Sequence, residues 1–187
     1  MTGVITFTVT FHEPFAVSSG NSDDGLDVTV DSANPLPGSV MKGLLRAHAR
    51  DWLGMGPAQV DSIFGSRTQQ SPWVFNDVLL TAKVSLWNRV EVDPDGRSQE
   101  RSLVVGQQNW ADCGTFSCEW LGGGQAPAAH VLILRAAARD VVSLGTNRRR
   151  GLGWVSIEDE TPWTAAHTQE LLALVDAVTT SKSEPTS

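Results

Sequence analysis

A short stretch near the amino end, residues 34–50 (NPLPGSVMKGLLRAHAR), constrains the fold more than any other part of the sequence. Pro35 and Pro37 keep the chain extended, because a residue that precedes proline is pushed out of the helical region of backbone space. Gly38 then permits a tight turn, and Ser39 is a competent N-cap for a helix that starts at Val40. The stretch therefore predicts an abrupt change from extended chain to helix.

The predicted helix carries a basic stripe beside its apolar side. Lys42, Arg46 and Arg50 recur at every fourth residue and so share one face. The free N–H groups at the amino end of a helix, with lysine and arginine one turn further on, attract phosphate. The alternative is a solvated face on an ordinary core helix, and the local pattern alone favours that alternative.

The bulk properties describe one domain of a cytoplasmic protein. A chain of 187 residues with 41% apolar residues is large enough for one core. No apolar run approaches the roughly 20 residues needed to cross a bilayer, and the start alternates like a strand without the basic region of a signal peptide. Cys113 and Cys118 are too few for a disulfide framework or a zinc site, which fits a reducing compartment.

Charge is distributed unevenly along the chain. The net charge of −7 argues against a generic nucleic-acid coat. The first 34 residues are purely acidic, whereas basic residues gather in two later places. If the two basic groups meet in space, an acidic protein can still hold a phosphate backbone. The first group is the stripe described above. The second group contains Arg135, Arg139, Arg148, Arg149 and Arg150.

Hydrophobic periodicity and turn residues predict an alternation of strands and helices. The order is a strand at 3–11, a polar loop at 18–34, the first helix, a short helix at 57–64, strands within 73–86, a hairpin around a DPDG turn, a strand at 115–121, a helix at 128–144 ended by Gly145, a strand at 151–157 and a helix at 164–178.

This order predicts an α+β protein with two helices against an antiparallel sheet. A ferredoxin-like (RRM-like) core fits it, with the acidic loop and the hairpin, residues 87–110, as insertions. Residues 1–178 are expected to form a single domain, and the polar end, residues 179–187, is expected to be disordered.

A second informative stretch is residues 145–154, GTNRRRGLGW. Gly145, Gly151 and Gly153 would let backbone N–H groups approach a ligand closely, and guanidinium groups grip phosphate oxygens in pairs. A solvent-exposed turn is the alternative. Three adjacent arginines, Arg148 to Arg150, in an acidic protein favour a phosphate clamp.

Aromatic residues and one histidine add weaker candidates. Trp73, Trp87, Trp110 and Trp154 could stack on bases, although most are expected in the core and only the hairpin residues Trp87 and Trp110 merit a test. His12 ends the first strand, where a structural role is the usual one and catalysis is the minority interpretation.

Several elements resemble one known family. PLPGSVMKGLLR is similar to the Pro-Gly-Ser-x-x-Lys-Gly-x-x-Arg signature of the RAMP superfamily of CRISPR proteins, and GTNRRRGLGW resembles its carboxyl-terminal glycine-rich loop. SIFGS with WVFNDVLL, and RVEVDPDG with GTFSCEW, resemble two further elements in the expected order. Val40, Met41 and Pro94 depart from the family pattern.

The resemblance implies a backbone subunit of a type III CRISPR effector complex, with a ferredoxin-like palm and a projecting thumb hairpin. Guide RNA, target RNA, other effector subunits and further copies of this chain would be its partners. Specificity would come from base pairing, while the protein reads the RNA backbone. On this chain the RNA-binding residues would be Ser39, Lys42, Arg46, Arg50, Arg148, Arg149 and Arg150, together with the glycine-rich loop.

The resemblance also implies a catalytic aspartate in the loop before the Pro-Gly-Ser helix. Asp27 occupies the matching place, with Asp24 and Asp31 as runners-up, in an endoribonuclease that uses Mg²⁺ or Mn²⁺ to cut single-stranded target RNA. A solvated loop with Asx-turns is the alternative for these aspartates. Two other functions stay open: a non-catalytic spacer or cap subunit, and guide-RNA processing by His12.

Overall fold

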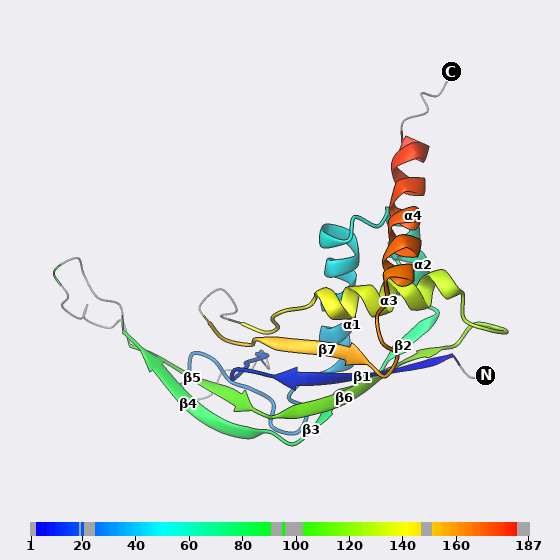
Figure 1. Cartoon of the computed structure of the whole chain (residues 1–187). Coiled ribbons are helices and arrows are strands. Elements are labelled where there is room, and N and C mark those ends of the chain that lie inside the picture. Colours follow the sequence, from blue (N-terminus) through cyan, green and yellow to red (C-terminus); the bar gives the residue numbers. More distant parts are fainter. Residues whose placement is uncertain are drawn as a thin grey trace.

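The computed structural model describes residues 3–18, 20, 25–90, 95, 103–146 and 151–182 (Figure 1). It is a mixed α/β chain in which every strand pairing is antiparallel within the named strands. The elements are β1 (Val4–Phe11), α1 (Gly38–Ala47), the π-helical turn η1 (His48–Trp52), α2 (Pro57–Phe64), β2 (Trp73–Phe75), β3 (Leu79–Leu80), β4 (Lys83–Arg89), β5 (Val104–Trp110), β6 (Cys113–Trp120), α3 (Ala128–Asp140), β7 (Val155–Asp159) and α4 (Ala165–Lys182).

The main sheet has the order β2-β6-β1-β7, with β3 also paired to β6. Figure 1 shows the helices gathered on one side of this sheet, while β4 and β5 form a separate two-stranded sheet that extends away from it. In the described part of the chain no helix is both long and apolar enough to span a membrane.

The two faces of the main sheet differ because side chains alternate along each strand. On β1, Phe7, Val9 and Phe11 are buried against the helices, whereas Thr8 and Thr10 are exposed on the opposite face, which we call the open face. The predicted strand at 3–11 is therefore confirmed, with its alternation intact.

The start of α1 differs from the sequence prediction. The N-cap is Pro37 rather than Ser39, which is the second helical residue and makes no side-chain cap. Gly38 does not serve a tight turn either. A Cβ on Gly38 would lie 2.1 Å from the carbonyl oxygen of Phe75, so a glycine is needed because the helix packs directly on the β2 backbone.

The helix α3 ends four residues before the predicted end, and Gly145 is not its C′ residue. Instead residues 142–144 pair with 153–155: the Leu144 N–H donates to the Gly153 carbonyl and the Val155 N–H donates to the Val142 carbonyl. This pairing is the physical reason for the early end, and β7 accordingly starts at Val155 rather than at 151. The helix α4 continues to Lys182, so the predicted tail boundary at 179 is too early.

The hairpin exists, and it starts earlier than predicted, since Lys83 already pairs with Trp110 and Arg89 with Val104. The predicted strands within 73–86 are divided among β2, β3 and the beginning of β4. Most of the DPDG turn lies outside the described residues. The short helix α2 is confirmed at both ends, with Pro57 first and Gly65 after its last residue.

Candidate nucleic-acid interface

Two loop segments pair with residues 105–109 of the strand β5, near the point where the hairpin leaves the sheet. We call this part of β5 the hairpin root. Phe15 exchanges backbone hydrogen bonds with Asn109, at 2.9 and 2.7 Å. Val28 forms a parallel bridge with Gly106. The long acidic loop is thus attached to the hairpin at its described end, residues 25–34.

Asp27 is fixed at this root by two hydrogen bonds to one residue. Its N–H donates to the Val105 carbonyl at 2.8 Å, and its carboxylate Oδ2 accepts the Val105 N–H at 2.9 Å. Asp27 itself is exposed. The loop that the sequence predicts to carry the catalytic group therefore holds this aspartate in a defined position beside the hairpin.

The other two candidate aspartates are placed differently. The Asp31 carboxylate accepts the N–H groups of Ala33 and Asn34 at 2.8 and 3.1 Å, which is the chemistry of an Asx-turn. Asp24 lies outside the described residues. Within the described part of the chain no group of three His, Cys, Asp or Glu residues could hold a metal ion, so Asp27 alone does not make a metal site from protein ligands.

The glycine-rich loop is attached to the same root through its stems. The Gly153 N–H donates to the Pro14 carbonyl at 2.8 Å, and the Thr146 N–H donates to the Ala16 carbonyl at 2.7 Å. Gly145 packs its Cα against the Ala16 carbonyl in the same place. Arg148, Arg149 and Arg150 lie outside the described residues, so their convergence with the basic stripe stays a prediction.

The Gly38 N–H at the amino end of α1 is already bound by a carboxylate, so the N–H groups there are not all free, in contrast to the sequence prediction. Asp77 Oδ1 accepts the Gly38 N–H at 2.7 Å, and Asp77 Oδ2 accepts from the Asn34 amide at 2.9 Å. Ser39 is exposed beside this cap. Sequence reasoning missed Asp77 because the partner lies 39 residues from Gly38 and no local pattern signals it.

The basic stripe, which runs over α1 and η1, is largely paired. Arg46 donates to Asp61 at 2.9 Å, and Arg50 donates twice to Asp51 at 2.7 and 2.8 Å. The hydrogen bonds from Arg50 hold the pKa of the Asp51 carboxyl below its ordinary value. The Lys42 ammonium instead lies over the Phe75 ring, 5.8 Å from its centre.

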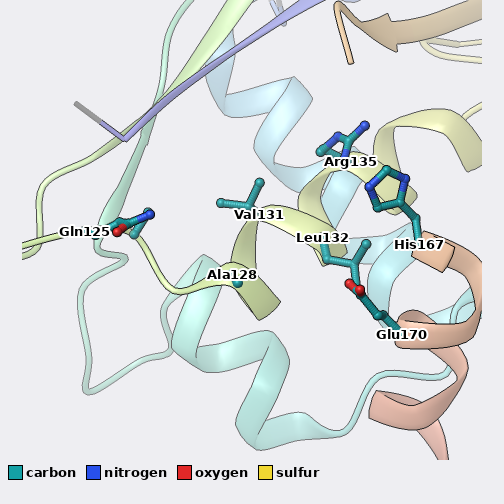
Figure 2. A pocket seen from close by; sticks show the side chains of 8 residues that line it. Gln125, Ala128, Val131, Leu132, Arg135, His167 and Glu170 are labelled. Carbon is teal, nitrogen blue, oxygen red and sulfur yellow. The ribbon is translucent and has the colours of Figure 1, made fainter. Parts of the chain in front are cut away.

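The side chains of Arg135 and Arg139, which the sequence predicts to belong to the second basic group, are hydrogen-bonded within the fold. Both donate to the buried carboxylate of Asp159 at 2.7 Å and to the Thr161 carbonyl. Figure 2 shows Arg135 beside His167 at a groove of about 560 Å³ between α3 and α4. Because its guanidinium is engaged by Asp159, this groove offers no available arginine for phosphate.

One face of the hairpin combines basic and aromatic side chains, and the sequence pattern showed only part of it. Alternation and register place Lys83, Trp87 and Arg89 on the same face as Trp110, which is 40% exposed. The Arg89 guanidinium lies 5.8 Å from the Trp87 ring, which covers the backbone of Gly106. We call this surface the basic aromatic face; aromatic rings beside cations are typical of single-stranded nucleic-acid sites.

The remaining candidates separate into core and surface. Trp73 is 2% exposed and donates to His130, as expected of a core residue. Trp154, by contrast, is 58% exposed. His12 Nε2 lies 2.7 Å from the Ser156 hydroxyl on the open face.

Comparisons with known proteins identify one family by sequence and solved structures of the same fold. The sequence matches the model of the RAMP superfamily over residues 8–156. Among solved structures, a chain of the type III-B Cmr-beta complex bound to cognate target RNA, seen by cryo-EM, superimposes with a TM-score of 0.66 at 10% identity, covering 83% of this chain and 96% of that one. A chain of the apo state of Cmr-beta gives 0.66 at 9% identity, covering 84% and 97%. No curated protein matches the sequence.

Proposed function

Because the chain belongs to the RAMP superfamily, we propose that it is an RNA-binding subunit of a type III CRISPR effector complex. The observation that carries this proposal is the hairpin root. There Asp27 of the acidic loop is hydrogen-bonded to β5. The stems of the glycine-rich loop are hydrogen-bonded through Thr146 and Gly153 to residues 14–16, and Phe15 in that segment pairs with β5. A single strand of RNA that follows the hairpin would meet both loops.

The topology supports the palm-and-thumb interpretation. β1 is followed by α1, β6 is followed by α3 and β7, and the strand order is β2-β6-β1-β7. This order fits the βαββαβ arrangement of a ferredoxin-like core, and in this proposal the hairpin of β4 and β5 would be the inserted thumb.

The proposed RNA contacts divide into stacking and phosphate contacts. The basic aromatic face would stack bases on Trp110 and pair Lys83 and Arg89 with phosphate. The exposed pairs of Arg46 and Arg50 with aspartate are weak because water screens them, so phosphate can displace the carboxylate. The phosphate-binding residues are proposed to be Ser39, Lys42, Arg46, Arg50, Arg148, Arg149 and Arg150, with the backbone of Gly145, Gly151 and Gly153.

The proposed partners follow from this role. Guide RNA would lie along the protein, and target RNA would be recognised by pairing with the guide rather than by contacts to its bases. Neighbouring positions would be taken by other effector subunits and further copies of the chain.

Binding can be tested by anisotropy with a labelled single-stranded RNA at several salt concentrations. Lys83→Ala, or Arg148→Ala combined with Arg149→Ala, should weaken binding and reduce the slope of affinity against salt by about 1 for each phosphate that is no longer neutralised. Arg67→Ala, an exposed cation away from the hairpin root, is the control. Unchanged affinity and slope in both test variants would contradict the proposed interface.

Target cleavage is the more specific part of the proposal. In that reaction the ribose 2′-oxygen attacks its own 3′-phosphate, a cyclic phosphate forms and the bond to the 5′-oxygen of the next nucleotide breaks. Asp27 would accept the proton of the 2′-hydroxyl, and an arginine or lysine would offset charge on the phosphate. Mg²⁺ or Mn²⁺ would take its remaining ligands from the RNA.

A non-catalytic spacer or cap subunit is the second candidate, and one observation favours it. The Asp27 carboxylate already accepts the Val105 N–H, and the described residues offer no cluster of metal ligands around it. In this alternative Asp27 only fastens the loop to the hairpin root.

Asp27→Asn separates the two candidates, because an amide oxygen can still accept the Val105 N–H while the charge is lost. In a complex assembled around guide RNA, the variant should bind target RNA normally and cut it about 10² to 10⁴ times more slowly. Asp31→Asn, which can keep its Asx-turn, is the matched control and should cut at the normal rate. Equal cutting by both variants would leave the chain as a non-catalytic subunit.

A further inference from the structure

Trp154 is a large apolar side chain that is exposed to solvent, although its backbone is paired on both sides. It is 58% exposed, yet its backbone is fixed from both sides. Its carbonyl accepts the His12 N–H at 2.9 Å, and it forms an antiparallel bridge with Ser143. Isolated surface tryptophans are common, so the exposure alone decides nothing; the paired backbone fixes the position from which the indole projects.

The side chains around Trp154 are polar and lie on the open face. Val155 and Ile157 are buried, so alternation sends Trp154 and Ser156 to the opposite side of β7. Ser156 is paired with Thr10, and continuing that register puts His12 directly opposite Trp154. The His12 ring is turned toward Ser156 by the 2.7 Å contact of Nε2 with the hydroxyl.

We propose that Trp154 is a stacking platform for one unpaired RNA base, with His12, Ser156 and Thr10 facing the edge of that base and its ribose. The inference rests on the proposed RNA-binding function and adds a contact site on the open face, separate from the hairpin. A ring flanked by hydroxyl and imidazole groups matches a nucleotide, which has an apolar face and hydrogen-bonding edges. An apolar protein partner would leave the hydroxyls of Thr10 and Ser156 facing an apolar surface.

Affinity of the full chain for single-stranded oligouridine and oligoadenine RNA tests the platform. Trp154→Ala should weaken binding about 5- to 150-fold, the usual range when one stacked base is released. Trp154→Phe should restore much of the affinity, and the slope of affinity against salt should stay unchanged in both. Trp52→Ala removes an even more exposed tryptophan, on the helix side of the sheet, and should leave binding unchanged.

Cross-linking on the unmodified protein gives a readout that does not depend on a variant folding. RNA that carries 5-iodouridine should cross-link on irradiation to the peptide that contains Trp154 and not to the peptide that contains Trp52. If the wild-type chain binds no RNA, the proposed function and this inference both fall. If it binds RNA but Trp154→Ala binds equally well and the Trp154 peptide is not cross-linked, only the platform is wrong. Loss of subunit assembly without loss of RNA affinity would likewise overturn it, in favour of a protein contact.

Discussion

The helix-covered face and the open face of the main sheet show two different uses of polar residues. On the helix-covered face of β7, the Asp159 carboxylate is buried and accepts from two arginines. One residue earlier, Glu158 alternates to the open face and is largely exposed, with only a 3.6 Å contact to Arg139. Charges buried under helices must be paired within the fold, whereas those on the open face can meet a ligand. Predicted ligand residues should therefore be judged by the face on which they lie.

The accessibility of the two faces can be compared through the reactivity of the two cysteines of β6, because their side chains lie on opposite faces. Cys113 is exposed opposite Thr10, whereas Cys118 is buried, and burial raises the pKa of its thiol above the ordinary value. Cys113 should react with a maleimide at least about 10³ times faster than Cys118, which reacts only when the fold opens. Peptide mapping after brief labelling measures the ratio. Comparable rates would mean that the two faces are not distinct.

Two neighbouring carboxylates then compare the faces energetically. Asp159→Asn removes the buried charge partner of Arg135 and Arg139 and should lower the free energy of unfolding by about 3–5 kcal/mol. Glu158→Gln, 3.6 Å from Arg139 and largely exposed, should lower it by less than about 1 kcal/mol. Urea denaturation monitored by circular dichroism measures both. A cost for Glu158→Gln as large as that for Asp159→Asn would contradict the comparison.

The glycine-rich loop offers a matched pair at the edge of the open face. A Cβ on Gly153 would lie 2.0 Å from the Leu144 carbonyl oxygen, and the φ of Gly153 is +75°. Gly153→Ala should therefore lower the free energy of unfolding by about 2–4 kcal/mol. Gly151 has a φ of +82°, but among the described residues no atom lies within 4 Å of an added Cβ, so Gly151→Ala should lower the free energy of unfolding by only about 1 kcal/mol. Denaturation curves check the difference. Equal costs would mean that the stem is not packed as tightly as the backbone bonds of Gly153 indicate.

What could be predicted from the sequence was local. The strand at 3–11 and the helix at 57–64 follow from side-chain alternation and from the positions of Pro57 and Gly65. The end of α3 could not be predicted, because pairing of residues 142–144 with the chain after the glycine-rich loop overrides a helical pattern. Contacts between residues far apart in the sequence also determine the geometry of the candidate site.

The candidate site shows the same limit. Basic residues on α1 are found by their four-residue spacing, but spacing does not reveal that Asp61 and Asp77 come from elsewhere to occupy Arg46 and the helix amino end. The sequence does not distinguish Trp154 from core tryptophans, because composition does not say which face of a strand meets the helices. Both limits concern tertiary neighbours rather than local structure.

The smallest expected effect concerns the paired stripe. If phosphate exchanges with the carboxylate on Arg46, Asp61→Asn should raise RNA affinity by up to about fivefold, because the competing charge is removed and the guanidinium stays in place. Asp51→Asn is the parallel test for Arg50. Anisotropy at low salt measures both, since exposed charges are least screened there. An affinity that stays constant in both variants would mean that these arginines serve the fold alone, and RNA contacts would then be confined to the hairpin and the open face.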